Sequence, residues 1–257
     1  MNKQDLKKKL QDNQLKPIKK LGQNFLIQEE IIQTIVKSIK KYSPPFVEIG
    51  PGLGALTQYF NKEDIWLIEK DKKIAQYWKK KSWRVLCLDA LHLSPDQLPE
   101  KMILFGNLPY EIAGSLILKL SEENFPSKAM VFLLQKEVAQ RIKSGIRNKN
   151  YGWLSVVSQI FWNISTITHV SKTCFYPIPK VNGTVLEFQK KQDFSFSPPL
   201  FLKFVKQCFQ FKRKMLFKKL PVREPKKLLE KISLNPECRA EDIPPKGFVR
   251  LYLEINS

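Results

Sequence analysis

The feature that most constrains the fold is a glycine-rich turn at the end of a short apolar run. The run Phe46-Val47-Glu48-Ile49 leads directly into Gly50-Pro51-Gly52-Leu53-Gly54, where glycine recurs at every second position. Glycine is needed where the backbone approaches a ligand closely, at angles forbidden to residues with a Cβ atom. The pattern predicts a buried strand and a nucleotide-binding turn. The spacing is GxGxG, not GxGxxG, and no GK[ST] follows, so a phosphate cradle is disfavoured.

Two more apolar runs end in acids. Ile65–Glu69 places Glu69 about 20 residues after the glycine turn, the spacing at which a carboxylate meets ribose hydroxyls. Arg84–Leu88 is followed by Asp89. Open α/β sheets bind ligands at the carboxyl edge of their parallel strands, so Gly50, Glu69 and Asp89 are expected to gather there. A Rossmann-like sheet that binds another nucleotide is the alternative.

The tetrapeptide Asn107-Leu108-Pro109-Tyr110 follows the apolar run Met102–Phe105. It is predicted to hold the exocyclic amine of an adenine. The Asn107 side-chain oxygen can accept one N6 hydrogen bond and the Leu108 carbonyl the other, because Pro109 keeps Leu108 extended. The Tyr110 ring offers a stacking face worth about 1–3 kcal/mol per base. An ordinary strand-to-helix turn is the alternative reading.

The remaining patterns complete an α/β domain. Further strands are predicted over Met102–Gly106, Ala129–Leu134, Ile164–Val170 and Thr184–Phe188, which gives a seven-stranded sheet whose last two strands pair antiparallel at one edge. After Lys190 the pattern changes, and helical spacing over Leu200–Leu220 predicts a small helical domain from about Pro198. We expect a basic arm (residues 1–20), an α/β domain (21–192) and a helical domain (198–257).

The charge balance indicates a polyanionic partner. The 257 residues contain 44 Lys and Arg against 24 Asp and Glu, a formal net charge of +20. Lysines cluster in residues 1–20, and a second basic cluster spans residues 203–219 without an acid. These side chains are candidate phosphate contacts, although about half of them are expected to lie on a solvated face.

Cysteine spacing and hydropathy limit the class of protein. Cys87, Cys174, Cys208 and Cys238 lack CxxC spacing, which indicates neither a metal site nor a disulfide framework. No apolar run approaches the roughly 20 residues of a membrane span, and the Lys-rich start has no apolar signal region. A cytoplasmic, reduced protein is expected. The two histidines, His92 and His169, are expected to be structural or surface residues.

With these motifs in place, the chain resembles the small-subunit ribosomal-RNA adenine N6,N6-dimethyltransferases, the KsgA type, which use S-adenosylmethionine. The resemblance runs almost end to end. It is carried by LGQNFL (21–26), VEIGPGLGALT (47–57), GNLPY (106–110), LLQKEVAQRI (133–142), YGWLSV (151–156), FYPIPKV (175–181) and RAEDI (239–243). The order of these motifs is far more specific than any one of them.

The resemblance implies a Rossmann-like class I methyltransferase fold and a role for each site residue. Gly50, with Gly52 in the same turn, is similar to the glycine beside the methionine part of the cofactor. Glu69 resembles the ribose carboxylate and Asp89 the acid that accepts a hydrogen bond from the cofactor's adenine amine. Asn24 and Leu26 match positions that close over the cofactor.

On the acceptor side, the methyl group is expected to point across Asn107, and Phe175 resembles the residue that stacks on the base opposite Tyr110. A core aromatic is the alternative for Phe175. The family implies two adjacent adenosines near the 3′ end of small-subunit rRNA as the acceptors. A monomer is the default oligomeric state.

Three rival functions remain open. The related resistance methyltransferases of large-subunit rRNA more often carry Ile where this chain has Leu108. A non-catalytic RNA-binding assembly factor would not need Glu69, Asp89 and Asn107. DNA adenine methyltransferases generally carry [DN]PP[YF] and a larger base-reading domain. The chain departs from the usual family pattern at Glu111, Ala113 and Gly183, and in the basic stretch Lys212–Met215 of the helical domain.

Overall fold

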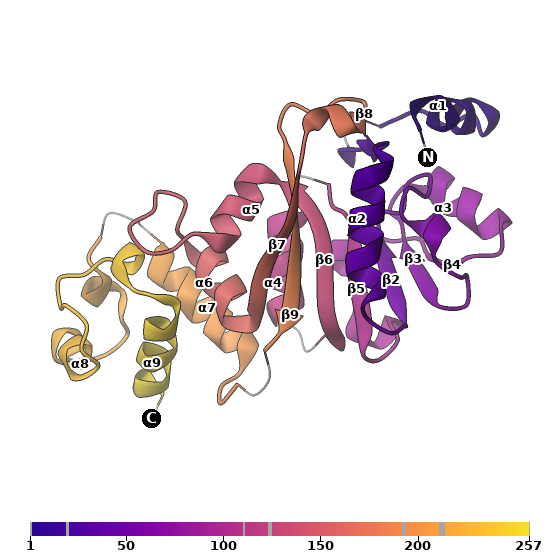
Figure 1. Ribbon diagram of the computed structural model, residues 1–257. Helices are drawn as coiled ribbons and strands as arrows, with labels where there is room; N and C mark the ends of the chain where they lie inside the picture. Colours follow the sequence, from indigo (N-terminus) through magenta and orange to yellow (C-terminus); the bar gives the residue numbers. More distant parts are fainter. Residues whose placement is uncertain are drawn as a thin grey trace. The chain divides into compact units, whose positions relative to one another are not determined.

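The structure is a computed structural model that describes residues 2–18, 21–109, 111–122, 125–191, 194–210 and 214–256. The chain forms two compact units (Figure 1). The first comprises Met1–Leu116, Phe125–Ala139 and Ile164–Lys190, and the second comprises Ile117–Asn124, Gln140–Asn163 and Lys191–Ser257. The second unit thus includes residues 117–124 and 140–163, which the sequence reading assigns to the α/β domain. Tyr110, Lys19, Lys20, Lys212 and Arg213 lie outside the described residues.

The first unit is built on the predicted seven-stranded sheet, in the order β4-β3-β2-β5-β6-β9-β7. Strands β4, β3, β2, β5 and β6 are parallel to one another, and β9 is antiparallel to β6. The strands are β2 (Phe46–Ile49), β3 (Ile65–Ile68), β4 (Arg84–Leu86), β5 (Met102–Asn107), β6 (Ser127–Gln135), β7 (Trp162–Val170) and β9 (Gly183–Lys190). Five parallel strands place their carboxyl ends at one edge, as the motif spacing requires.

Strands β9 and β7 are neighbours at one edge of the sheet, as expected. The His169 Nδ1 atom lies 3.1 Å from Thr184 Oγ1, and Ser165 donates a hydrogen bond to Glu187 over 3.2 Å. Moving along β7 from Ser165 to His169, the partner on β9 moves back from Glu187 to Thr184, so the two strands run antiparallel. His169 therefore has a structural role, since its ring contacts the neighbouring strand at the edge of the sheet.

The structure contains a second, two-stranded sheet that the sequence patterns did not predict. Strand β1 (Phe25–Leu26) pairs antiparallel with β8 (Phe175–Tyr176), and Leu26 is opposite Phe175. The Ile27 N–H donates a further hydrogen bond of 2.8 Å to the Cys174 carbonyl. Strands of two residues have no measurable periodicity, so only the tertiary fold reveals that LGQNFL and FYPIPKV are joined.

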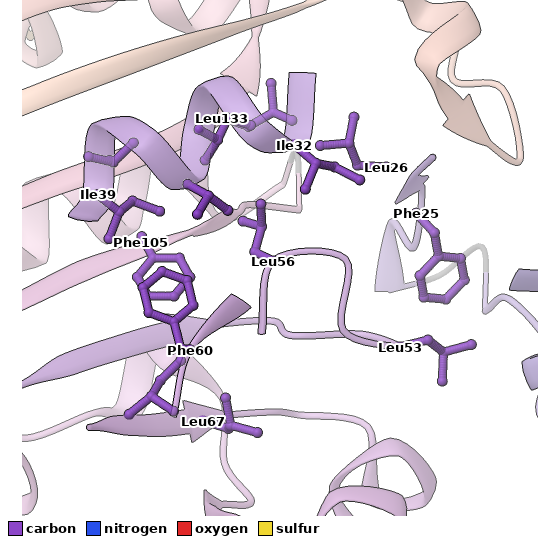
Figure 2. Packing of buried hydrophobic residues seen from close by; sticks show 14 of the residues in the cluster. Phe25, Leu26, Ile32, Ile39, Leu53, Leu56, Phe60, Leu67, Phe105 and Leu133 are labelled. Carbon is purple, nitrogen blue, oxygen red and sulfur yellow. The ribbon is translucent and has the colours of Figure 1, made fainter. Parts of the chain in front are cut away.

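Helix α2 (Glu29–Lys40) lies in front of strands β2 and β5 in the view of Figure 1, and it also contacts β6. Its buried residues are Ile32, Ile35, Val36 and Ile39, the spacing of one helical face. They pack toward Phe105 and Leu133 of the sheet (Figure 2). The rings of Phe60 and Phe105 stack with their centroids 4.9 Å apart. Burial of each large side chain stabilises the fold by roughly 1.5–3 kcal/mol, so this face fixes α2 on the sheet.

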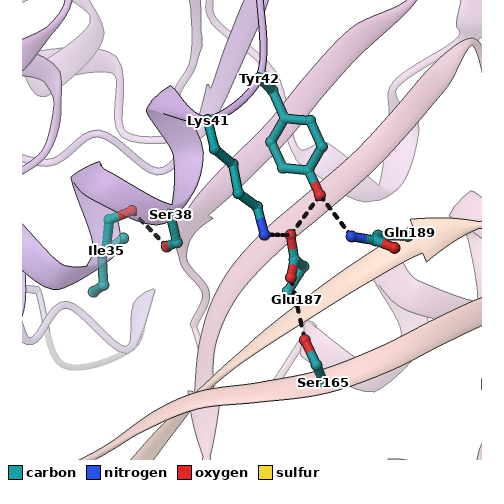
Figure 3. A network of polar contacts seen from close by, with 7 residues as sticks. All are labelled: Ile35, Ser38, Lys41, Tyr42, Ser165, Glu187 and Gln189. Atoms are coloured by element: carbon teal, nitrogen blue, oxygen red, sulfur yellow. Dashed lines mark hydrogen bonds and ion pairs between the residues drawn. The ribbon is translucent and has the colours of Figure 1, made fainter.

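The carboxyl end of α2 is tied to the sheet by a polar network (Figure 3). The Glu187 carboxylate is only 5% exposed. It forms an ion pair of 2.5 Å with Lys41 and accepts hydrogen bonds from Tyr42 and Ser165. Burial and the Glu187 carboxylate raise the pKa of Tyr42 to about 12. The network fixes the helix that directly follows the LGQNFL segment.

The expected basic arm contains a helix, α1 (Lys3–Asp12), within the first unit. Asn2 caps it and forms a capping box with Asp5. Leu6 and Leu10 are buried, so the lysines lie on the other face. The Lys9 amine is 3.5 Å from the carbonyl of Leu53 in the glycine turn. The α1 helix is therefore packed beside the glycine turn.

In the residues that the structure describes, the regular elements of the second unit are helices, apart from the start of β7. Helix α7 begins at Pro198, where the sequence predicts the helical region to begin. Aromatic rings of Phe161, Phe196, Phe201 and Tyr252 pack together with centroids 4.6–6.2 Å apart. The helices wholly in this unit are α6 (Trp153–Phe161), α7 (Pro198–Phe209), α8 (Pro225–Lys231) and α9 (Pro245–Ile255).

The other helices are α3 (Lys72–Lys80), α4 (Ala113–Glu122) and α5 (Lys136–Lys143). None of the helices in the described parts of the chain has the length and hydropathy to cross a membrane.

Candidate active site

A cleft at the carboxyl edge of the parallel strands collects the predicted site residues. Its empty volume is about 1090 Å³, including its open mouth. This size suits a ligand as large as a nucleoside with a side chain. The predicted residues that line it are Asn24, Leu26, Gly50, Gly52, Glu69, Asp89, Asn107 and Pro109. Sequence spacing alone thus identified the residues of three strand ends that meet here.

Two glycines allow the strand ends to meet. Gly50 has φ +68°, a left-handed backbone that turns the chain away at the end of β2. Its N–H donates a hydrogen bond of 2.8 Å to the Ile68 carbonyl of β3. Gly106 lies so close to β2 that an added Cβ would be 2.2 Å from the Ile49 carbonyl oxygen. Asn107 therefore reaches the cleft beside the glycine turn.

Glu69 extends from the end of β3 and is 7% exposed. Burial raises its pKa to about 7, and the negative charge of Asp71 adds to that rise. The Asp71 N–H opposes it with a hydrogen bond of 2.8 Å to a Glu69 oxygen. No described Lys or Arg pairs with Glu69, so its charge is available to hydroxyl donors of a ligand.

Asp89 follows β4 and forms an ion pair of 2.7 Å with Lys70. One of its oxygens accepts a hydrogen bond from the Leu91 N–H at 3.0 Å. Burial raises the pKa of Asp89, but Lys70 and the Leu91 N–H outweigh burial, so the pKa lies below its usual value. Asp89 is therefore a fixed, ionised acceptor for an amine.

The sequence reading missed Glu48, which lines the same cleft. It is 2% exposed and accepts a hydrogen bond of 2.6 Å from the Thr57 hydroxyl. Burial raises the pKa of Glu48 to about 8, with a smaller contribution from Glu69. A carboxylate inside an otherwise apolar strand was the signal that could have identified it, because buried acids are rare.

Asn107 is oriented by the LGQNFL segment. Its side-chain nitrogen donates a hydrogen bond of 2.8 Å to the backbone carbonyl of Asn24. A carbonyl can only accept, so the Asn107 side-chain oxygen is the atom left for a ligand. The segment is held in turn by Gln23, whose side-chain nitrogen donates to Asp71 at 3.0 Å. Gln23 is a second residue that the sequence reading missed.

Leu108 has a buried side chain, 1% exposed, and contributes its backbone to the site. Its N–H donates a hydrogen bond of 3.1 Å to the Leu133 carbonyl of β6. Among the described residues, none donates a hydrogen bond to the Leu108 carbonyl. Both acceptors predicted for an adenine amine, the Asn107 side-chain oxygen and the Leu108 carbonyl, are therefore unused by these residues.

The predicted stacking residues are less completely described. The Phe175 ring is 2% exposed and belongs to the hydrophobic core, although β8 places it opposite Leu26 of the cleft. Tyr110 is outside the described residues. The stacking role of both residues stays a prediction.

The chemistry of the cleft fits S-adenosylmethionine. Glu69 can accept hydrogen bonds from ribose hydroxyls and Asp89 from an adenine amine, while Gly50 leaves space without a side chain beside Asn107. The excess of acids on the cleft wall suits a cationic ligand. These residues would hold the nucleoside between the ends of β2, β3 and β4.

The comparisons agree with this geometry. The family model described as "Ribosomal RNA adenine dimethylase" matches residues 14–257. The chain is 39% identical over 248 residues to the ribosomal RNA small subunit methyltransferase A of Bdellovibrio bacteriovorus, covering 91% of this chain and 90% of that one. It is 35% identical over 250 residues to the protein of the same name from Mycoplasma mobile, covering 93% and 98%.

Solved structures show the same fold. A dimethyladenosine transferase from Plasmodium falciparum superposes with a TM-score of 0.78 at 25% identity, over 90% of this chain and 97% of that one. The 23S rRNA methyltransferase ErmE superposes with a TM-score of 0.66 at 22% identity, over 91% and 100%. The chain belongs to the ribosomal RNA adenine dimethylase family of S-adenosylmethionine-dependent methyltransferases.

Proposed function

We propose that this protein dimethylates N6 of two adjacent adenosines near the 3′ end of small-subunit (16S) rRNA during ribosome biogenesis. The observation that carries the proposal is the orientation of Asn107, whose nitrogen is bound to Asn24 and whose oxygen is left for a base. The relatives named small subunit methyltransferase A, matched over about nine-tenths of this chain, support the choice of RNA.

We assign the cofactor-binding roles to the cleft residues. Glu69 accepts hydrogen bonds from the ribose hydroxyls, and Asp89 accepts one from the adenine amine of the cofactor. Gly50 and Gly52 line the side of the methionine part, and Asn24 and Leu26 close over the nucleoside. The position of all six residues along one cleft supports this assignment.

S-adenosylmethionine supplies an electrophilic methyl group when bound. The Asn107 oxygen and the Leu108 carbonyl each accept one N6 hydrogen of the acceptor adenine. This holds the N6 lone pair out of conjugation with the ring and directs it toward the cleft. Alignment of two reactants can supply about 7–11 kcal/mol of the acceleration. The methylated nitrogen is acidic, so its proton passes to water and no strong base is needed.

The acceptor base has to leave its helical stack, which costs a few kcal/mol. Tyr110 and Phe175 are proposed to stack on its two faces, with Pro109 fixing the backbone between the amine acceptors and Tyr110. Because Phe175 is 2% exposed, this role requires its ring to turn out of the core when RNA binds.

We further propose that the protein acts as a monomer in the cytoplasm. Its four cysteines are free, which fits a reducing compartment. The net charge of +20 fits a ribosomal RNA partner.

One experiment separates the candidate functions. The protein is incubated with labelled S-adenosylmethionine and either immature small subunits or deproteinised large-subunit RNA, and the methylated bases are mapped. We expect dimethyladenosine only in the small-subunit RNA. Label only in large-subunit RNA would establish the resistance-type activity, and RNA binding without label in either sample would establish an assembly factor.

A further inference from the structure

A hollow lined by three lysines lies outside the cofactor cleft, in the first unit. Its empty volume is about 540 Å³, including its open mouth. It lies between the start of α5 and the loop that joins β7 to β9. Its lining residues are Lys136, Glu137, Lys172, Lys180, Val181 and Asn182.

Backbone contacts fix the shape of this lysine hollow. The Lys136 N–H donates a hydrogen bond of 3.0 Å to the Asn182 carbonyl. The Asn182 side-chain oxygen accepts a hydrogen bond of 3.0 Å from the Lys172 N–H. Gln135 and Gly183 are partners in the β6–β9 ladder, so Lys136 and Asn182 continue two paired strands. The backbone hydrogen bonds of Lys136 and Lys172 to Asn182 therefore hold the two sides of the hollow together.

The charges of the hollow are unbalanced. The residues that line it include three lysines and one acid, Glu137. Within the described part of the chain, the amines of Lys136, Lys172 and Lys180 have no ion-pair or hydrogen-bond partner. Like charges brought together without partners repel each other, and an anion relieves that repulsion. RNA phosphates are anions that lysines neutralise.

The hollow lies at the same sheet edge as the amine-binding tetrapeptide. Strand β6 is the neighbour of β5, and Asn107 is in register with Leu133. Lys136 is three residues beyond Leu133, about 10 Å along an extended strand. Lys180 belongs to the same loop as Phe175, the proposed stacking residue. An RNA strand that delivers a base to Asn107 therefore passes close to the hollow.

We propose that the lysine hollow binds backbone phosphates of the RNA strand that flanks the target adenosine. The proposal rests on the proposed function in one respect, that the acceptor is an unpaired adenosine of RNA. The hollow positions the strand and contributes no group to methyl transfer. Its lysines are expected to affect RNA affinity and not the chemical step.

The test compares three variants with the wild-type protein. The first replaces Lys136, Lys172 and Lys180 with Gln. The matched control replaces Lys37, Lys79 and Lys128, which are exposed and line none of the cavities described above, with Gln. The third is Glu137→Gln. The dissociation constant for an RNA fragment from the 3′ end of small-subunit rRNA is measured at several salt concentrations, together with KM and kcat.

For the first triple variant, the slope of log affinity against log salt should fall by about 0.7 for each phosphate that is no longer neutralised. Its KM for RNA should rise by about tenfold and its kcat stay within about twofold, because the chemical step is untouched. Glu137→Gln should bind RNA more tightly, a gain that misfolding cannot produce. Unchanged cofactor affinity verifies the fold of each variant.

Equal salt slopes and equal KM values for the two triple variants would overturn the proposal. So would a Glu137→Gln variant that binds RNA no more tightly than wild type. If the wild-type protein methylates only large-subunit RNA, the proposed function fails instead. The same comparison on that RNA then decides whether the hollow binds phosphate.

Discussion

The side-chain amide of Asn107 donates a hydrogen bond to the backbone carbonyl of Asn24, 2.8 Å away and 83 positions earlier in the chain. This hydrogen bond couples the LGQNFL segment, which lines the cleft, to the tetrapeptide that we propose holds the acceptor base. The same amide has its nitrogen fixed by the protein and its oxygen left for the substrate. The position of the LGQNFL segment and the orientation of the Asn107 side chain are therefore linked by one hydrogen bond.

Replacement of Asn107 with Ala should lower kcat by at least about 10²–10³-fold, the usual loss when one preorganised hydrogen-bonding group is removed from an active site. Cofactor affinity should stay measurable, since Glu69 and Asp89 are intact. Single-turnover methylation and calorimetric cofactor binding test this, with the exposed Asn61→Ala variant as control. Wild-type turnover by Asn107→Ala would refute the assigned role.

Gly106→Ala should destabilise the first unit strongly. The added Cβ would lie 2.2 Å from the Ile49 carbonyl oxygen, so β2 and β5 would have to separate, at a cost of about 1–3 kcal/mol or more. Gly145→Ala is the matched control, because a Cβ added there would have no described neighbour within 4 Å. Denaturant unfolding measures both. Equal midpoints for the two variants would contradict the tight approach of the strands.

Cofactor affinity should rise with pH through about 7. Burial raises the pKa of Glu69 to about 7, and the ionised carboxylate accepts hydrogen bonds with both oxygens and more strongly than the protonated form, in which one oxygen becomes a donor. Glu69→Gln should weaken binding about 10- to 100-fold at pH 8 and by less at pH 6. Cofactor titrations of both proteins between pH 5.5 and 8.5 measure the difference in affinity between wild type and variant. A difference in affinity that is independent of pH would show that Glu69 does not titrate in this range. The Glu63→Gln variant, at an exposed position, serves as control.

Glu48→Gln should stabilise the protein increasingly as pH rises. Burial raises the pKa of Glu48 from 4.5 to about 8 in the folded state, so between these pH values the folded protein holds a proton that the unfolded chain releases. The stability of the wild-type protein therefore falls as pH rises from about 4.5 through 8, whereas Gln at this position does not titrate. Gln can still accept the Thr57 hydrogen bond. The difference in melting temperature, variant minus wild type, should be near zero at low pH and largest above pH 8. A constant difference would mean that folding does not change the pKa of Glu48.

Tyr42→Phe should cost about 1–2 kcal/mol, because it removes a hydrogen bond to the buried Glu187 carboxylate. Tyr59→Phe is the matched control, since it removes a similar bond to Glu29, whose carboxylate is exposed. We expect the control to change stability by less than about 0.5 kcal/mol. Urea unfolding of the two variants gives the comparison. A larger effect at Tyr59 would mean that burial of the carboxylate does not set the strength of these hydrogen bonds.

Much of the fold follows from local sequence. The seven strands of the main sheet were predicted because short apolar runs are bounded by turn residues. Their boundaries differ slightly from the prediction: the strand from Arg84 ends at Leu86 and not at Leu88. The strands β1 and β8, two residues each, could not be predicted, since their only defining property is the pairing between them.

For the site, motif spacing was enough to predict which residues meet at the carboxyl edge, because parallel strands end at the same edge and Gly50, Glu69, Asp89 and Asn107 each lie at the end of a strand or shortly after it. Their orientation depends on the tertiary fold. The hydrogen bond of Asn107 to Asn24, the burial of Glu48 and the gathering of three lysines in one hollow bring together segments far apart in the chain. Orientation and burial are set by neighbours in space, and a linear spacing does not contain them.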